Sequence, residues 1–292
     1  MGDVVPELNE RIMTGFRTRM ARDSRVKQVA KRIANGSATL NDGHTYAAAV
    51  GENMSKAMKA AFTPEALPNG KLYYNIADRT VRPAMLESYN LVNDTAAEIQ
   101  TIVDASTGIG MGAVRAEFPE SRIDDLIGKI CEDVDNLDNA MVWLTEPIVN
   151  NAEGFFDDYV DTNAEVRERS GLKAKITRTA EYNACAWCED LEGSWDYGDQ
   201  PDDVYRRHEY CRCSVTYTTE KAEQSVWSKR SWEPKKEDIE RRKETDMPAV
   251  MSTNERAAVL EQLERDREIA QSGLQREYGR KYAREATLRG RG

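Results

Sequence analysis

Four of the five cysteines and one of the two histidines fall within 29 consecutive residues. They are Cys185, Cys188, His208, Cys211 and Cys213. Thiolate sulfur and imidazole nitrogen are ligands that zinc prefers, and the two-residue gap between the first two cysteines lets both sulfurs reach one ion. A closed structural site takes four ligands. The spacing therefore predicts a zinc site built from four of these five side chains, in which Cys211 or Cys213 joins the first three.

Other uses of the cysteines are a redox dithiol or buried thiols that bind nothing. A thioredoxin-like pair needs a helix after the CxxC within a βαβ unit, whereas residues 189–199 contain two glycines and indicate a turn. An open catalytic zinc needs a nearby general base, and neither Glu189 nor Glu209 lies in an HxE or HExxH arrangement. The sequence thus favours a structural Zn²⁺, with no catalytic residues and no site for another cofactor.

The chain is acidic, with 51 Asp and Glu against 41 Lys and Arg and a formal net charge of −10. This balance disfavours a protein dedicated to coating nucleic acid, although a local basic segment can still contact DNA. No apolar run approaches the ~20 residues of a membrane span, and residues 1–17 lack the apolar core of a secretory signal. We therefore expect synthesis in a cytoplasm, where thiols stay reduced and clustered cysteines are metal ligands.

The elements that must position the cysteine cluster are expected to be mostly helical. Apolar residues recur at three- and four-residue spacing in five segments, which are 4–34, 45–62, 78–106, 121–150 and a helix through Phe155 that ends near Gly171. Pro147 is expected to kink or end the fourth helix. Loops are expected at 35–43, 63–70 and 107–112, where glycine, proline and asparagine gather.

The character of the sequence changes at Lys173. Residues 174–180 and 211–219 show the alternation and the β-branched content of short strands. From residue 252 onward the chain has a charged helical pattern, and from Arg276 it holds six basic residues against two acidic ones. The predicted fold is mainly α, with a helical body over 1–172, a small α+β zinc-stapled module over 173–220 and a charged helical tail over 221–292.

The stretch that contains the cysteines resembles a known family. The strings TRTAEYNACAWCEDLEGSWDY and DDVYRRHEYCRCSVTY, within residues 177–217, follow the order CxxC, a glycine–aromatic step, a variable turn, HxxCRC and a strand. This order is similar to the C-terminal module of phage minor head proteins, the Mu F-like or SPP1 gp7-like head morphogenesis family. The resemblance covers roughly 60 of the 292 residues, and no family motif is evident in the helical front part.

The resemblance implies a structural minor head (minor capsid) protein of a tailed bacteriophage, made in the bacterial host cytoplasm and carried in the virion. It implies association with the portal or the head interior, and a role in head assembly or DNA delivery. The expected partners are the portal protein and the major capsid protein. Packaged DNA is a further expected partner, contacted by the basic tail from Arg276.

Two alternative functions belong to other classes. A zinc module that binds nucleic acid is suggested by Arg206, Arg207 and Arg212 beside the expected ligands. An ADP-ribosyltransferase-type enzyme is suggested only by members of the family. Glu165 and Glu168, and likewise Glu189 and Glu192, have the wrong spacing and context for its Glu-x-Glu pair.

Three further residues or segments have simpler expected roles. The glycine-rich run 108–112 lacks a phosphate-binding ending and is expected to be a joint between helices. His44 is expected at a turn or on the surface, because no second ligand lies near it in the sequence. Cys131 is expected to be a small core residue on the apolar face of its helix.

Overall fold

A computed structural model describes residues 2–182 and 184–220. The chain divides into two units, Met1–Glu223 and Gln224–Gly292, and all described residues belong to the first. The helix expected from residue 252 and the basic tail from Arg276 lie outside the described residues. Within the described part, no helix has the length and the apolar content that crossing a membrane requires.

The described residues form helices and a small sheet, and the prediction of a mainly helical chain is confirmed. The helices are α1 (Val5–Arg22), α2 (Ser24–Ala34), α3 (Leu40–Ala61), the short 3₁₀ helix η1 (Pro68–Gly70), α4 (Tyr74–Thr107), α5 (Glu120–Ile130), α6 (Leu137–Trp143), α7 (Glu146–Arg169) and α8 (Ala186–Asp190). The strands are β1 (Lys173–Thr179), β2 (Gly193–Asp196) and β3 (Ser214–Glu220).

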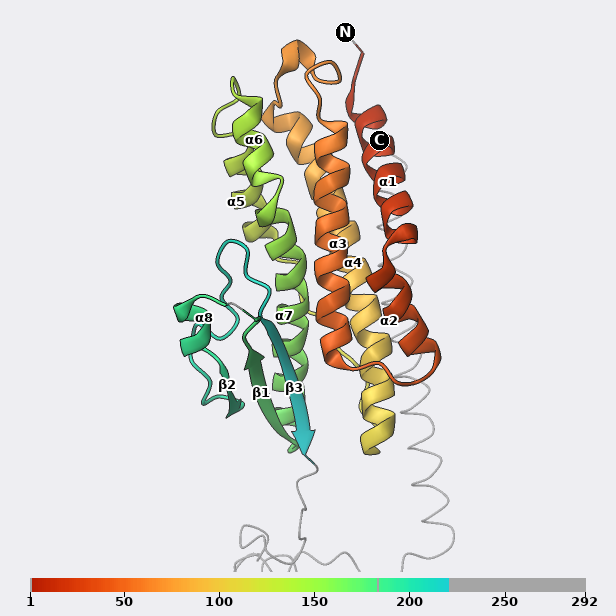
Figure 1. The fold of residues 1–292 in the computed structure, drawn as a ribbon, viewed down its shortest axis with the longest axis vertical. Helices are drawn as coiled ribbons and strands as arrows, with labels where there is room; N and C mark the ends of the chain where they lie inside the picture. Colours follow the sequence, from red (N-terminus) through yellow and green to blue (C-terminus); the bar gives the residue numbers. More distant parts are fainter. Residues whose placement is uncertain (1, 183, 221–292) are drawn as a thin grey trace, which may run out of the picture. The chain divides into compact units, whose positions relative to one another are not determined.

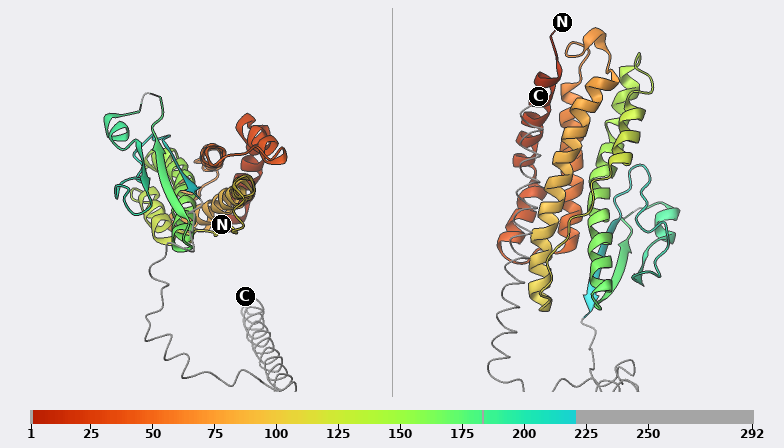
Figure 2. Two further views of the ribbon diagram at one scale, coloured as in Figure 1. Left: turned by 90° about the horizontal axis from the view of Figure 1, so that it is seen from below. Right: turned by 180° about the vertical axis from the view of Figure 1, so that it is seen from behind.

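The long helices pack side by side, with the sheet on one flank (Figure 1). Helix α3 packs against α1 and α4, and α7 packs against both α3 and α4. Strands β1 and β3 lie against α7, and β3 also contacts α3, so these two helices lie between the sheet and α1 and α2 (Figure 2). Ala174 and Ile176 of β1 and Val215 and Tyr217 of β3 belong to the same hydrophobic core as the helices.

The sheet is antiparallel with the strand order β2-β1-β3. Ile176 in the central strand pairs with Trp195 on one side and with Tyr217 on the other. The strands expected near 174–180 and 211–219 are therefore present. Strand β2 was not expected, because its four residues are too few to show a clear alternation.

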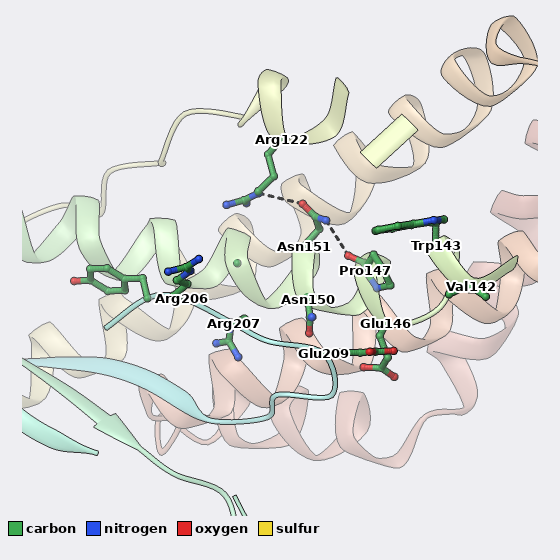
Figure 3. Close-up of a pocket in the computed structure, with 12 residues that line it drawn as sticks. Arg122, Val142, Trp143, Glu146, Pro147, Asn150, Asn151, Arg206, Arg207 and Glu209 are labelled. Atoms are coloured by element: carbon green, nitrogen blue, oxygen red, sulfur yellow. Dashed lines mark hydrogen bonds between the residues drawn. The ribbon is translucent and has the colours of Figure 1, made fainter. Parts of the chain in front are cut away.

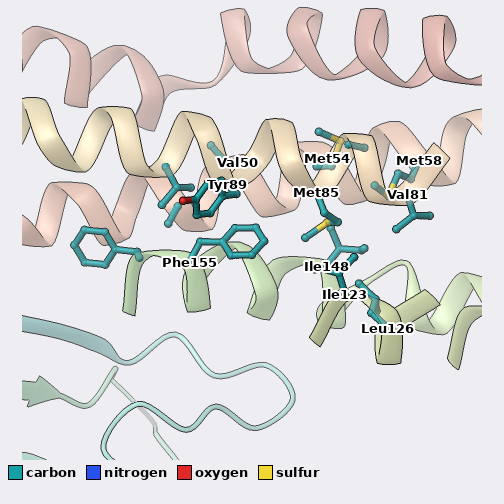
Figure 4. Close-up of a cluster of buried hydrophobic side chains, with 14 of the residues drawn as sticks. Val50, Met54, Met58, Val81, Met85, Tyr89, Ile123, Leu126, Ile148 and Phe155 are labelled. Carbon is teal, nitrogen blue, oxygen red and sulfur yellow. The ribbon is translucent and has the colours of Figure 1, made fainter. Parts of the chain in front are cut away.

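Apolar residues spaced by one helical turn form the core between α3, α4, α5 and α7 (Figure 4). Val50 and Met54 of α3 face Met85 and Tyr89 of α4, and all four are buried. The rings of Tyr89 and Phe155 meet edge to face, with 5.7 Å between their centroids. Each large side chain buried in this way contributes on the order of 1.5–3 kcal/mol to folding.

Helices α3 and α7 approach each other closely at Gly51. A Cβ atom at this position would lie 2.7 Å from Val149 Cα and 2.9 Å from Ala152 Cβ. These distances are shorter than van der Waals contact, so only glycine permits this separation of the two backbones. The same contact holds α7, which carries the sheet, against the rest of the bundle.

The helix expected over 4–34 is wrong as a single element. It breaks at Asp23, whose extended backbone has ψ of 125° and whose carboxylate accepts a hydrogen bond from the Arg25 amide. Helix α3 also starts earlier than expected, at Leu40. Thr39 and Asp42 form a capping box there, which satisfies amide groups that the helix leaves unpaired. The loop expected at 35–43 is shorter for this reason.

The helix expected over 121–150 is also wrong, because three helices occupy this stretch. The chain leaves the helical conformation over 131–136, and Asn136 caps α6 by accepting from the Asn139 amide. Pro147 lies in the first turn of α7 rather than at the end of a helix. A proline is tolerated in the first turn because its missing N–H would have no partner there. The break expected at 107–112 is present, since α4 ends at Gly108 with a φ of 66°.

Candidate metal centre

The five expected ligands come from two short segments beside β1. Cys185 is the N-cap residue of α8 and Cys188 lies within that helix. His208, Cys211 and Cys213 lie in the loop that leads into β3. A tight turn brings this loop back on itself, because the Cys211 amide donates to the His208 carbonyl at 3.2 Å. Tyr210, within the turn, has a φ of 60°, a conformation that usually favours glycine.

The structure brings all five side chains together. His208 Nε2 lies 3.2 Å from Cys185 Sγ and 3.0 Å from Cys188 Sγ. Cys188 Sγ lies 3.8 Å from Cys211 Sγ. With Zn–S bonds of about 2.3 Å, two sulfurs of a tetrahedral site are about 3.8 Å apart. The separation of the Cys188 and Cys211 sulfurs therefore matches that of two thiolates bound to one zinc ion.

Cys188 is the residue that both halves of the cluster share. Cys185, Cys188 and His208 form one group of potential ligands, and Cys188, Cys211 and Cys213 form another. Within each group the donor atoms all lie within 4.8 Å of one another. Both members of the Cys211/Cys213 pair are thus within reach of Cys188, and these residues could hold a metal ion.

The inner part of the cluster is shielded from solvent. Cys188, Cys211 and Cys213 are buried, whereas Cys185 is exposed and His208 is half-buried. Burial raises the pKa of the Cys188 thiol to about 12, and it also raises the pKa of Cys211. A bound cation opposes this effect because a metal ligand must be the thiolate, so metal binding at neutral pH releases protons.

The tautomer of His208 suits metal binding through Nε2. Its Nδ1 lies 2.6 Å from the Glu209 carbonyl oxygen, which can only accept a hydrogen bond. The proton therefore belongs on Nδ1, and the Nε2 lone pair points toward the cysteines. Trp187 meets the imidazole edge to face at 5.8 Å and packs against the cysteine cluster.

Arg178 of β1 lies beneath the cluster and is almost fully buried. Its Nη2 is 3.7 Å from both Cys188 Sγ and Cys211 Sγ. Its Nη1 donates to the carbonyl oxygens of Val204 and Arg206. The guanidinium therefore places a positive charge beside two sulfurs and fixes the loop that carries His208. The sequence marked Arg178 only as part of a strand, and its role depends on tertiary contacts.

Two arginines next to the ligands attach this loop to α7. Arg207 donates to both carboxylate oxygens of Asp157, at 2.6 and 2.8 Å, and also to the Cys213 carbonyl. Arg212 donates to Glu146 at 2.8 Å. Both side chains are directed into the helical body, while the Arg206 side chain is 72% exposed.

The expectation for His44 is wrong, because it is buried in α3 rather than placed at a turn or on the surface. Its Nε2 faces Glu153 Oε1 at 3.6 Å, and neither atom has a hydrogen-bond partner among the described residues. Burial lowers the pKa of His44 to about 3 and raises the pKa of Glu153 to about 7. His44 is three, four and seven residues before Ala47, Ala48 and Gly51, which are buried on the same face of α3. This spacing would have indicated a buried His44 if the expected helix had included residues 40–44.

Cys131 is half-buried at the end of α5, where it packs against the core. Burial raises the pKa of its thiol to about 11, so it is a neutral thiol at physiological pH. Trp195 also packs against the main core.

A hollow of about 700 Å³ adjoins the metal loop (Figure 3). Trp143, Pro147 and Asn150 line it from the side of α6 and α7, and Arg206 and Glu209 line it from the loop. Among the described residues, the candidate ligands do not line this hollow. The hollow is therefore separate from the cysteine cluster. The two are linked by one hydrogen bond, which Asn150 Nδ2 in the lining donates to the His208 carbonyl at 3.1 Å.

The cysteine pair lies at the start of a short helix, and the turn expected over 189–199 follows it, at Leu191 and again at residues 197–198. That helix, α8, has five residues, and the neighbouring strands β1 and β2 run antiparallel. Around the pair, the described residues therefore lack the parallel βαβ unit of a thioredoxin-like site.

No family model, curated protein or solved structure matches the chain. The function is accordingly inferred from the site and from the sequence resemblance.

Proposed function

We propose that residues 173–220 bind one structural Zn²⁺ through four of the five side chains Cys185, Cys188, His208, Cys211 and Cys213. The observation that carries this proposal is their convergence on Cys188, at distances that suit a tetrahedral site. Zinc suits this donor set because it prefers thiolate and imidazole ligands. Cys211 is the fourth ligand that we favour, because its sulfur lies 3.8 Å from that of Cys188.

The local charges support the same assignment. Three thiolates, one neutral imidazole and Zn²⁺ leave a net charge of −1 at the site. A buried charge of this kind needs a partner of opposite sign. Arg178 supplies it, with one nitrogen 3.7 Å from each of two sulfurs. In a site closed by four protein ligands the ion stabilises the fold and does not activate water.

We further propose that the chain is a structural minor head protein of a tailed bacteriophage, carried in the virion and not an enzyme. The support is the resemblance of residues 177–217 to the Mu F-like head morphogenesis family, together with the gathered cysteines and the helical body. The portal protein and the major capsid protein are the proposed partners. Packaged DNA is a further one, through the basic tail from Arg276.

Nucleic-acid recognition by the zinc module is less well supported. Of the three arginines that suggested it, Arg207 and Arg212 form ion pairs with carboxylates of α7. Only Arg206 keeps a largely exposed side chain. A single exposed arginine supplies little of the charge that phosphate binding requires.

The test of the head-protein proposal is the composition of assembled particles. Heads of the encoding phage, purified after nuclease treatment, are analysed by quantitative mass spectrometry, with the portal protein as the copy-number reference. We expect the chain at a few copies per portal, and fewer copies for the Cys188→Ser variant than for Cys131→Ser. Absence of the wild-type chain from heads would contradict the proposal. Nicotinamide release from NAD by the purified chain would instead support the transferase alternative.

A further inference from the structure

The second half of α1 and the whole of α2 are strongly basic in an acidic protein. Between positions 11 and 34 the chain has eight basic residues and one acidic residue, which is a net charge of +7 against −10 for the full chain. Both helices lie on the side of α3 and α4 away from the sheet (Figures 1 and 2). The positive charge is therefore concentrated on the flank opposite the candidate metal centre.

Most of this charge is not neutralised within the fold. Arg25 forms ion pairs with Asp23 and Glu52, and Arg32 pairs with Asp42. The other basic residues of the segment form no ion pair with any residue in 2–182 or 184–220; we call them the basic face, and they are Arg11, Arg17, Arg19, Arg22, Lys27 and Lys31. Clustered cations repel one another, so leaving them unpaired favours an anionic partner.

Part of the basic face borders a groove between α1 and α3. Two adjoining hollows, of about 370 and 510 Å³, share Thr14 and Gly15. Arg11 lines the first hollow, and Arg19 and Arg22 line the second. Positions 11, 15 and 22 fall on one side of a helix, and at 1.5 Å per residue the two outer arginines are about 16 Å apart along its axis.

The groove contains further groups that suit an anion. Lys56 of α3 also lines it and pairs with Glu52 at 3.6 Å, while Glu10 and Asp23 are the acidic residues of its lining. The Nε atom of Arg19 is buried and has no hydrogen-bond partner within the described part of the chain. Gly15 lies on the floor of the groove, where a Cβ would be in ordinary van der Waals contact with Ala57 Cβ at 3.7 Å.

The residue types point to phosphate groups on a duplex. Arginine presents a planar set of donors that matches phosphate oxygens, and arginine dominates the basic face. The large apolar side chains exposed in the described residues all lie outside α1 and α2. Single-stranded nucleic acid would need exposed aromatic rings for stacking, and a membrane surface would need exposed apolar residues for insertion.

We propose that the basic face of α1 and α2, with the groove along α3, binds the phosphate backbone of double-stranded DNA without reading its sequence. This surface is distinct from the metal module and from the basic tail. It therefore holds or fails independently of the zinc site and of the head-protein proposal.

The experiment measures binding of the full chain to a fluorescent 30-base-pair duplex by anisotropy, between 50 and 200 mM salt. One variant replaces Arg17, Arg22, Lys27 and Lys31 by Gln. The matched control replaces four exposed cations elsewhere by Gln, namely Arg115, Lys129, Arg169 and Lys173. The two variants have the same net charge, and glutamine preserves helix propensity. Circular dichroism verifies that both are folded.

For the first variant we expect affinity at 50 mM salt to fall about tenfold or more, and the slope of log K against log salt to become shallower by about 3 to 4. The control is expected to bind nearly as tightly as the wild type. Equal losses in both variants would overturn the proposal, as would tighter binding to single strands or to anionic vesicles than to the duplex. If replacing the six basic residues from Arg276 onward abolishes binding while the α1–α2 variant binds normally, the tail is the DNA site and the proposal is wrong.

Discussion

Arg178 is the residue that we expect to matter most for the candidate metal site apart from the ligands. Replacing it by Gln removes the positive charge beside Cys188 and Cys211 and leaves two carbonyl groups without their donor. Loss of a group that supports metal ligands typically lowers metal affinity about 10–100-fold. We predict a loss of this size for Arg178→Gln in zinc competition with a chromogenic chelator.

The control for this prediction is Arg206→Gln, which removes a cation near the same loop. The Arg206 side chain is largely exposed and pairs only with Asp203 among the described residues. This variant should bind zinc like the wild type. Equal zinc affinity of the Arg178 variant and the wild type would show that the guanidinium does not support the site.

His44 and Glu153 are predicted to give opposite dependences of stability on pH. Burial raises the pKa of Glu153 from 4.5 to about 7, against the lowering effect of Arg207 and Arg212. The folded state therefore holds this proton more tightly than the unfolded state, and the contribution of Glu153 to the free energy of unfolding falls as pH rises from 4.5 to 7. The pKa of His44 is lowered by burial from 6.5 to about 3, so its contribution falls as pH drops from 6.5 to 3. Between pH 4.5 and 6.5 the two effects cancel.

Single substitutions remove this cancellation. With His44→Gln, the free energy of unfolding should fall as pH rises from 4.5 to 6.5, by up to about 1.4 kcal/mol per pH unit. With Glu153→Gln it should rise over the same range by a similar amount. Urea unfolding at several pH values measures both slopes, and subtracting one variant from the other removes the groups that they share. Parallel slopes would mean that Glu153 does not gain a proton and His44 does not lose one when the chain folds.

At the scale of elements, the close packing of α3 on α7 is the contact that we expect to tolerate least change. In Gly51→Ala the new methyl group would meet Val149 and Ala152 at less than 3 Å, so the helices must separate. Overpacking of this kind costs about 1–3 kcal/mol. We predict this loss in the free energy of unfolding, measured with urea.

Gly128→Ala in α5 is the matched control, because a Cβ there has no atom within 4 Å. Alanine is favoured over glycine in a helix by roughly 0.5–1 kcal/mol, so this variant should be slightly more stable than the wild type. A neutral Gly51→Ala variant would show that the two helices are not held at the distance described.

The sequence predicted most helices and the break at 107–112, but not the breaks at Asp23 and over 131–136. Apolar spacing continues past Asp23 and across 131–136, so periodicity alone cannot show that a local side-chain cap ends a helix there. The metal ligands could be predicted because they are close in sequence and of distinctive types. The supporting residues Arg178, Arg207 and Asp157 could not, because arginine and aspartate are common and only the packing of β1, α7 and the loop brings them together.

At the scale of the whole described unit, the metal loop and the helical bundle are joined through ion pairs and a shared core. Arg207 and Arg212 attach the loop to α7, whereas β1 and β3 contribute to the main hydrophobic core. We therefore predict that removing the metal with a chelator loosens residues 180–213 and leaves α3, α4 and α7 folded. Hydrogen exchange read by mass spectrometry should show faster exchange confined to that stretch. Global loss of protection would contradict this separation.

The most direct test of the metal centre is the metal content of the chain purified without affinity metals. Mass spectrometry of the wild type and of Cys131→Ser should find about one zinc per chain, because Cys131 lies outside the cluster. Cys188→Ser should contain none, because both groups of ligands include Cys188. A folded wild type that contains no zinc and binds none when it is added, or a Cys188 variant that retains its zinc, would contradict the account.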